Sequence, residues 1–174
     1  PDHFWSDAGV RRLVRRLAAR GVDRLYWRVC GGGDPLYPSA LVSARRMRKV
    51  APLFREHLEL PPSFGDFNAF DPVRAAVEEA HAAGLEIYAW FTGCEDDHGA
   101  SGVVGEFAAA HPELLQQNRF GQPLSGNLSF AYPEVLDYKR ALTEEFLGYG
   151  FDGLLLDCTR ENGGFSRWKL EYPA

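Results

Sequence analysis

The 174-residue sequence has little of what several classes of protein require. It contains three cysteines, Cys30, Cys94 and Cys158, and this odd number argues against a complete framework of disulfides. No apolar run approaches the roughly 20 residues that span a bilayer, so we expect no membrane-spanning segment. An excess of positive charge is also missing, because the net charge is −5. That charge argues against a nucleic acid partner, which would need a basic surface.

No signal peptide is recognisable, and the chain begins at Pro1 instead of Met, which indicates a piece of a longer protein. What the sequence does contain is apolar: 45% of the residues are hydrophobic and 13% are aromatic. Such a composition can build the core of one domain of ordinary size.

Predicted helices and strands alternate along the chain. Helices are expected at about 6–20, about 72–83, about 101–110 and from Pro133 onward, with capping signals at Ser6 and Asp71. Strands are expected at Arg24–Cys30, Glu86–Thr92 and Gly153–Asp157. This alternation predicts an α/β fold with a parallel sheet, its three strands adjacent and in chain order.

The segment from Phe151 to Glu161 is the most informative part of the chain. Its three consecutive leucines, 154–156, are typical of a strand that is covered on both faces. Asp157 follows them at the carboxyl end of the strand, which is where α/β barrels build their active sites. Asp157 is therefore the first candidate for a catalytic residue, and the alternative is an aspartate that only ends the strand.

Alternation of side chains along each strand places Arg28 and Asp157 on the same face of the predicted sheet. An ion pair between them would lower the pKa of Asp157 and keep it ionised, which suits a nucleophile or an electrostatic stabiliser. The alternative is a buried ion pair that only locks neighbouring strands together.

Aromatic side chains also follow the strands. Trp90 lies near the end of the second strand, and Tyr37 and Trp168 lie in the segments after the first and third. Aromatic faces at a cleft suit stacking on sugar rings, although Trp90 can equally be a core residue. The acidic segment 95–98 lacks the spacing of a calcium loop and is expected to be a surface loop, and we expect no metal and no cofactor.

Several segments together resemble the family 10-like glycosyl hydrolases. They are Tyr26–Val29, Gly33–Ser39, Ala75–His81, Gly84–Trp90, His111–Glu113, Tyr132–Tyr138 and the final strand with Asp152, Gly153 and Asp157. The resemblance implies a (β/α)8 TIM barrel that acts on glycans, often as an exported bacterial enzyme. Residues 1–174 would then be a partial barrel that covers about the second to fourth strands, because a whole barrel has about 250 residues.

The leading functional hypothesis is therefore a glycoside hydrolase whose partner is a poly- or oligosaccharide. Hydrolysis needs two carboxylates, for which Asp157 and Glu161 are the candidates. The residues expected to contact the glycan are Arg28, Tyr37, Trp90, Arg160 and Trp168. Two alternatives stay open: a non-catalytic carbohydrate-binding barrel, and a barrel enzyme that uses Arg28 for an anionic substrate. The sequence does not predict the oligomeric state.

Overall fold

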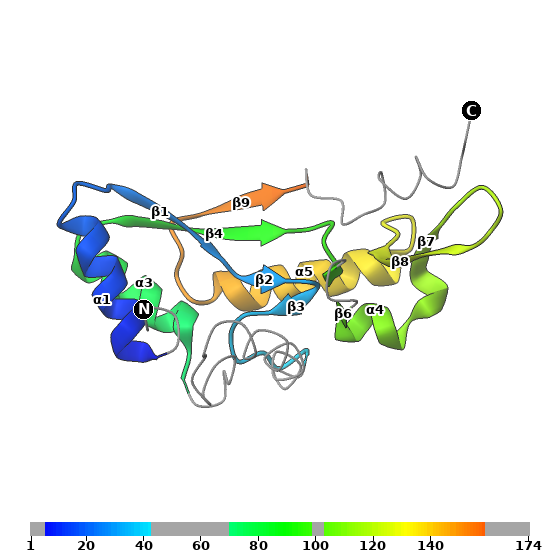
Figure 1. Ribbon diagram of the computed structural model, residues 1–174, viewed down its shortest axis with the longest axis horizontal. Coiled ribbons are helices and arrows are strands. Elements are labelled where there is room, and N and C mark those ends of the chain that lie inside the picture. Colours follow the sequence, from blue (N-terminus) through cyan, green and yellow to red (C-terminus); the bar gives the residue numbers. More distant parts are fainter. Residues whose placement is uncertain (1–5, 43–69, 99–102, 159–174) are drawn as a thin grey trace, which may run out of the picture.

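The fold is built on a parallel sheet of three strands. A computed structural model describes residues 6–42, 70–98 and 103–158 (Figure 1). The strands β1 (Arg24–Arg28), β4 (Glu86–Thr92) and β9 (Gly153–Asp157) lie in the order β1-β4-β9. Both pairs are parallel, which confirms the predicted sheet and its strand order. In the register, Arg28 lies beside Trp90, and Thr92 lies beside Asp157.

The helices begin at the predicted capping residues. The Ser6 hydroxyl accepts a hydrogen bond from the Gly9 amide (3.1 Å) and starts α1 (Asp7–Ala18). The Asp71 carboxylate accepts from the amides of Val73 and Arg74 and starts α3 (Pro72–Ala82), with Pro72 in the first turn as expected. The longest helix, α5 (Pro133–Leu147), also begins at a proline.

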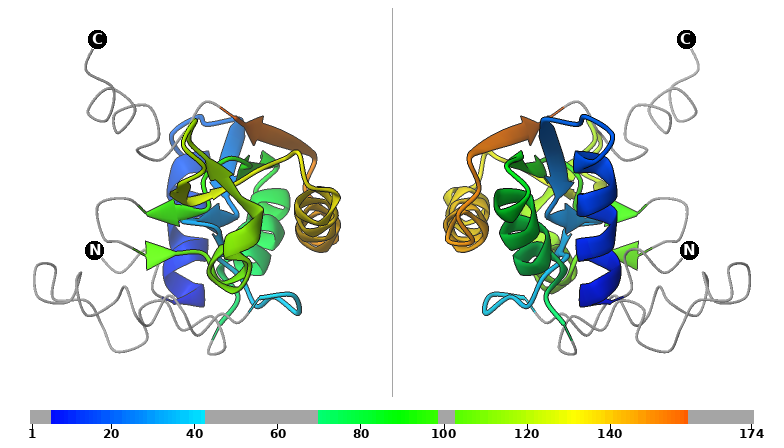
Figure 2. Two further views of the ribbon diagram at one scale, coloured as in Figure 1. Left: turned by 90° about the vertical axis from the view of Figure 1, so that its right-hand side faces the viewer. Right: turned by 90° about the vertical axis from the view of Figure 1, so that its left-hand side faces the viewer.

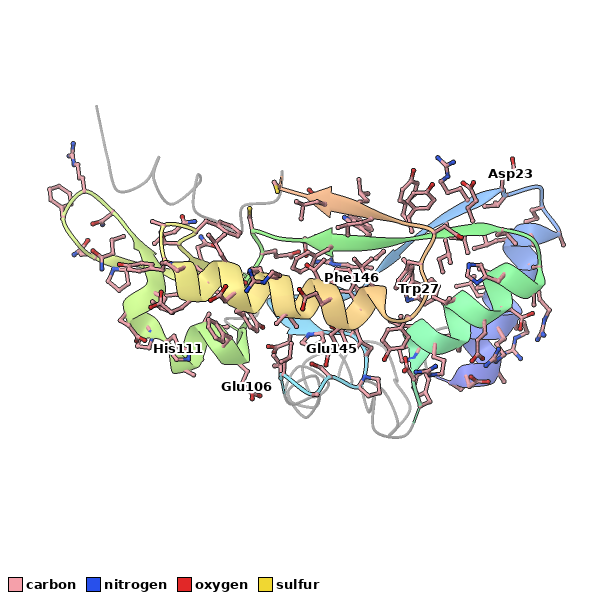
Figure 3. The ribbon with its side chains drawn as sticks, turned by 180° about the vertical axis from the view of Figure 1, so that it is seen from behind. Asp23, Trp27, Glu106, His111, Glu145 and Phe146 are labelled. Carbon is pink, nitrogen blue, oxygen red and sulfur yellow. The ribbon has the colours of Figure 1, made fainter. Side chains whose placement is uncertain are left out.

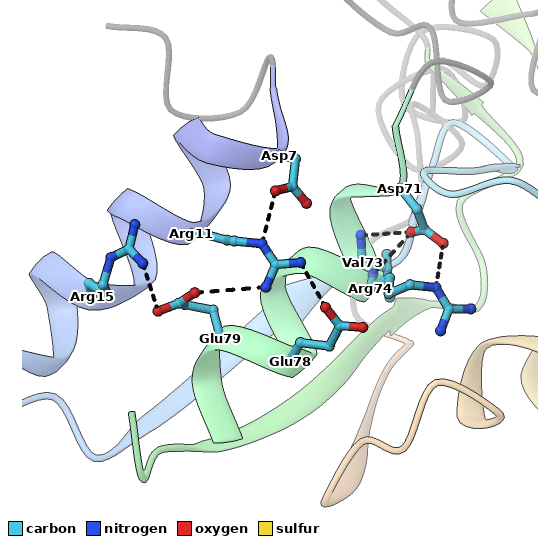
Figure 4. A network of polar contacts seen from close by, with 8 residues as sticks. All are labelled: Asp7, Arg11, Arg15, Asp71, Val73, Arg74, Glu78 and Glu79. Carbon is cyan, nitrogen blue, oxygen red and sulfur yellow. Dashed lines mark hydrogen bonds and ion pairs between the residues drawn. The ribbon is translucent and has the colours of Figure 1, made fainter. Parts of the chain in front are cut away.

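Helices α1 and α3 lie side by side and are joined by ion pairs at their exposed surface (Figure 4). Arg11 of α1 contacts Asp7 (2.9 Å) on its own helix and Glu78 (2.7 Å) on α3, and Arg15 contacts Glu79 (3.2 Å). Exposed pairs of this kind contribute about 0–1 kcal/mol each, so the packing of the two helices depends mainly on their apolar sides.

The helices α1, α3 and α5 cover one face of the sheet (Figure 2). The β4 side chains Ile87, Ala89 and Phe91 point into this layer and are buried there. They meet apolar side chains of α1 and α3, and Phe91 packs on Phe146 of α5 with ring centroids 5.3 Å apart (Figure 3). The opposite face of the sheet carries no helix among the described residues.

Short antiparallel ribbons were not expected from the sequence. They are β2 (Cys30–Gly31) with β3 (Asp34–Pro35), β5 (Asp97–His98) with β6 (Val103–Val104), and β7 (Leu115–Gln117) with β8 (Pro123–Leu128). The helix α4 (Glu106–Ala110) and a 3-10 turn, Pro112–Leu114, lie among the last two ribbons. Gly32 and Gly33 turn the first ribbon with φ of 59° and 84°, and a Cβ on Gly33 would lie 2.8 Å from the Asp96 carbonyl oxygen.

A second apolar cluster lies beside these ribbons. Its buried members are Val42, Ala108, Leu114, Leu115, Leu128, Val135, Tyr138 and Leu142. The helix α5 supplies Val135, Tyr138 and Leu142 to this cluster, and it supplies Phe146 to the core between the sheet and the helices. The helix therefore joins the two cores. Across the described ranges, no helix is long and apolar enough to cross a membrane.

The predicted TIM-barrel fragment is wrong. Within the described residues the sheet is open, with β1 and β9 as its two edges, and the remaining strands form small antiparallel ribbons. The leucines of β9, expected to be covered on both faces, are 39%, 40% and 55% exposed at Leu154, Leu155 and Leu156. A barrel fills its interior with layers of side chains, whereas one face of this sheet is left uncovered by helices in the described ranges (Figure 2). The chain is a small α/β domain with a parallel sheet.

Candidate functional site

The uncovered side of the sheet carries a set of aromatic and charged side chains. Alternation along each strand turns every second residue to this side. We call this surface the open face, and its members are Arg24, Tyr26, Arg28, Glu86, Tyr88, Trp90, Leu155 and Asp157. Three predicted site residues, Arg28, Trp90 and Asp157, therefore lie together on it.

Trp90 is the centre of these three residues. Its indole Nε1 donates a hydrogen bond to Oδ2 of Asp157 (3.0 Å) on the neighbouring strand. On the other side, the guanidinium of Arg28 lies 5.9 Å from the centroid of the Trp90 ring, within the range of a cation–π contact. The indole is thus held between a cation on β1 and a carboxylate on β9.

The expected ion pair between Arg28 and Asp157 is replaced by two other contacts of Arg28. Its Nε donates to the Cys30 carbonyl oxygen (2.8 Å), and its Nη2 pairs with the carboxylate of Glu95. Glu95 is buried and comes from the acidic segment after β4. The sequence predicted a surface loop there, so the actual partner of Arg28 was missed.

Two tyrosines extend the aromatic surface along the open face. The rings of Tyr26 and Tyr88 are tilted against each other with centroids 5.7 Å apart, and Tyr26 is 49% exposed. The Tyr88 ring lies over Gly153 of β9, where a Cβ would come within 2.3 Å of Tyr88 Cε1. Gly153 therefore makes room for the ring, which is one reason for a glycine at the start of this strand.

An ion pair closes the same surface at the amino-terminal end of the strands. The Arg24 guanidinium donates from Nε to Glu86 (2.7 Å) and lies 4.9 Å from the centroid of the Tyr88 ring. The open face is therefore an aromatic surface with charged groups at both ends.

A buried ion pair beside the candidate site was also missed by the sequence analysis. Asp96 and Lys139 are 1% and 7% exposed, and their side chains pair directly. Asp96 also accepts a hydrogen bond from the Leu128 amide (3.3 Å). Burial raises the pKa of Asp96, while the Lys139 ammonium and the Leu128 amide act in the opposite direction. The pair ties the loop after β4 to α5 and β8.

Neither Glu95 nor Asp96 forms part of a metal site among the described residues. In the part of the chain that the structure describes, no group of three or more His, Cys, Asp or Glu side chains is arranged to hold a metal ion. The carboxylates of Glu95 and Asp96 instead pair with the partly buried Arg28 and the buried Lys139.

Tyr37 lies in the core and not at the candidate site. It is completely buried, its hydroxyl donates to Glu145 of α5 (3.0 Å), and its ring meets Tyr149 edge-on with centroids 5.5 Å apart. Burial raises the pKa of the Tyr37 phenol well above its usual range. Because no part of the ring is exposed, Tyr37 cannot stack on a ligand.

Three further candidates, Arg160, Glu161 and Trp168, lie outside the described residues, so the structure does not place them.

Comparison with known proteins supports the fold and does not identify an activity. No protein-family model and no curated protein matches the sequence. The crystal structure of a hypothetical protein from Ruminiclostridium thermocellum ATCC 27405 is similar, with a TM-score of 0.58 and 14% sequence identity. The match covers 98% of this chain and 89% of that chain. At this identity the likeness shows the fold alone, and the match over most of both chains agrees with a small α/β fold and not with a barrel fragment.

Proposed function

We propose that this protein binds a carbohydrate on the open face of its sheet. The observation that supports the proposal is the row of aromatic side chains, Tyr26, Tyr88 and Trp90, on a sheet face that no helix of the described residues covers. The C–H groups on the face of a sugar ring are weakly positive and apolar, and an aromatic ring presents a negative face to them. Exposed apolar surface rimmed by polar groups is typical of a binding site.

Polar groups at both ends of the aromatic row suit the hydroxyl groups of a sugar. A hydroxyl both donates and accepts hydrogen bonds, so its recognition needs donors and acceptors side by side. Asp157 supplies a carboxylate next to Trp90, and Arg24 and Glu86 supply a cation and an anion next to Tyr88. The open face thus offers an extended glycan stacking surface between two sets of polar contacts.

Glycoside hydrolysis is the second candidate, and the position of Asp157 at the carboxyl end of β9 favours it. Hydrolysis requires two carboxylates on either side of the scissile bond, about 5–10 Å apart. Glu95 is buried and pairs with Arg28, which makes it a poor second carboxylate. Among the described residues, binding without hydrolysis therefore has the better support, and Glu161, the other candidate carboxylate, lies outside them. An anionic substrate has less support, because the Arg28 guanidinium already contacts the Glu95 carboxylate and the Cys30 carbonyl oxygen.

The test is electrophoresis of the folded protein through native gels that contain xylan, mixed-linkage β-glucan, galactomannan or starch. We expect at least one polysaccharide to retard the protein. Tyr26→Ala should weaken that binding about tenfold, which corresponds to the roughly 1.4 kcal/mol of one exposed stacking contact. The matched control is Phe120→Ala, because Phe120 is also exposed (66%) but lies on the turn between β7 and β8. No retardation by any of the four, or equal losses in both variants, would refute the proposal.

Asp157→Asn separates binding from hydrolysis. The amide oxygen of Asn can still accept the hydrogen bond from the Trp90 indole, so we expect binding to change by less than about threefold. An assay of released reducing ends decides between the two candidates. If the unmodified protein releases reducing ends and Asp157→Asn does not, hydrolysis replaces simple binding as the function.

A further inference from the structure

Two of the three cysteines lie together at the carboxyl ends of neighbouring strands. Cys94 follows β4 by two residues, and Cys158 directly follows β9. The pairing of the strands continues up to this point, because the Gly93 amide donates to the Asp157 carbonyl oxygen (3.1 Å). The register pairs Thr92 with Asp157, so Cys94 lies two residues and Cys158 one residue beyond the same paired position. Neighbouring strand ends provide the short separation that a disulfide needs.

The two thiols differ in their exposure to solvent. Cys158 is exposed, whereas Cys94 is partly buried, and burial together with the neighbouring Cys158 raises the pKa of Cys94 to about 11. A reagent in solution therefore meets Cys158 first. The third cysteine, Cys30, is fully buried, and its pKa is raised to about 12, so it provides an unreactive reference within the same chain.

We propose that Cys94 and Cys158 are a reversible dithiol–disulfide pair that is oxidised by exchange with a low-molecular-weight disulfide. This proposal does not depend on carbohydrate binding, since neither Cys94 nor Cys158 belongs to the residues of the open face.

The exchange proceeds in two steps that balance. The Cys158 thiol loses its proton to solvent, and its thiolate attacks one sulfur of the small disulfide; the S–S bond of the reagent breaks, and one small thiolate leaves. The Cys94 thiol then loses its proton, and its thiolate attacks Sγ of Cys158 and displaces the second small thiolate. The protein loses two electrons and two protons, and the small disulfide becomes two thiols once the released thiolates take up those protons.

The disulfide would fasten an edge strand whose apolar side chains are exposed. Among the described residues β9 pairs only with β4, and Leu154, Leu155 and Leu156 are all exposed. A covalent bond between residues 94 and 158 closes a long loop of the chain, so it restricts the unfolded state. We therefore expect the oxidised protein to have a higher midpoint of urea unfolding than the reduced protein.

The test uses the folded protein and glutathione disulfide as the oxidant. After exchange, denaturation and alkylation should label one thiol instead of three, and peptide mapping should link Cys94 to Cys158. Dithiothreitol should restore all three thiols. Cys94→Ser should stop at the mixed disulfide on Cys158, with the mass of one glutathionyl group added, whereas Cys30→Ser should still form the internal bond.

Two results would overturn the proposal. One is a protein in which Cys94 and Cys158 both remain alkylatable after exposure to excess glutathione disulfide. The other is a bond that forms only between two chains, seen as a dimer in a non-reducing denaturing gel.

Discussion

Replacing Lys139 by Met tests the buried ion pair that holds the loop after β4 against α5. The ammonium of Lys139 pairs with the carboxylate of Asp96, and both side chains are almost fully buried. Methionine has a similar length but no charge, so the substitution leaves a carboxylate buried without its cation. Removal of one partner of a buried pair costs about 3–5 kcal/mol, which is a large part of the roughly 5–15 kcal/mol that stabilises a whole domain.

The assay is urea unfolding at 25 °C followed by circular dichroism, with the free energy of unfolding extrapolated to water. The matched control is Arg140→Met, at the next position of the same helix. Arg140 pairs with Asp137 (2.9 Å), but both side chains are about two-thirds exposed, so this variant should lose no more than about 1 kcal/mol. The double variant Lys139→Met with Asp96→Asn should regain much of the loss, because no unpaired charge remains.

The pH dependence of Lys139→Met follows from the pKa of Asp96. Burial raises this pKa in the folded state. The folded protein therefore holds the proton of the Asp96 carboxyl group more tightly than the unfolded chain does. The stability that comes from this proton is fully present below the ordinary pKa of aspartate, about 3.9, and is lost as the pH rises through the raised pKa of the folded state. The deficit of the variant should therefore shrink in acid. Equal losses in Lys139→Met and Arg140→Met at neutral pH would refute the assignment of this pair as a structural tie.

Two further substitutions test the sheet and its open face. Gly153→Ala places a methyl group 2.3 Å from Cε1 of Tyr88, so the Tyr88 ring must move. We expect a melting temperature within a few degrees of that of the unmodified protein and weaker polysaccharide binding in the gel assay. Unchanged binding would contradict the role of Tyr88 on the open face. The Asp152 carboxylate accepts a hydrogen bond from the Ile87 amide of β4 (2.7 Å), which lowers the pKa of Asp152. A lowered pKa stabilises the fold above the ordinary value of about 3.9, and this contribution disappears as the pH falls through the folded value. Asp152→Asn should therefore show a shallower loss of stability in acid, measured by urea unfolding between about pH 2 and pH 5, and a slope equal to that of the unmodified protein would contradict the assignment.

The elements with local signals were predictable from the sequence. Ser6 and Asp71 cap helices where the sequence placed them, because a cap depends on the residue itself and the three that follow. The strands Glu86–Thr92 and Gly153–Asp157 also have the predicted bounds. These signals depend on a few consecutive residues, so no knowledge of distant packing was needed.

Closure of the sheet was not predictable in the same way. Alternating helices and strands look alike in sequence whether a sheet stays open or closes into a barrel, because closure depends on the pairing of the two edges. The leucines of β9 illustrate the difficulty: an apolar run predicts a covered strand, but covering depends on elements elsewhere in the chain. The exposure of Leu154 and Leu156 is thus a tertiary property.

The polar part of the candidate site was missed for a related reason. Consecutive acidic residues at 95–97 are typical of a solvated loop, and only a cation that is distant in sequence reverses that interpretation. Glu95 pairs with Arg28, 67 positions away, and Asp96 pairs with Lys139, 43 positions away. Lys139 itself lies in a helix in which a lysine would ordinarily be exposed. A single sequence contains no signal that joins these positions.

The same two carboxylates link the stability of the fold to the geometry of the open face. Asp96 is fixed by the buried ammonium on α5, and its chain neighbour Glu95 pairs with Arg28. Arg28 in turn lies against the Trp90 ring, whose indole donates to Asp157. A displacement of the loop after β4 would therefore move the Arg28 guanidinium away from the Trp90 indole, even if the strands themselves kept their positions. It follows that Lys139→Met, although distant from the aromatic row, should weaken binding on the open face even in molecules that remain folded, whereas Arg140→Met should not.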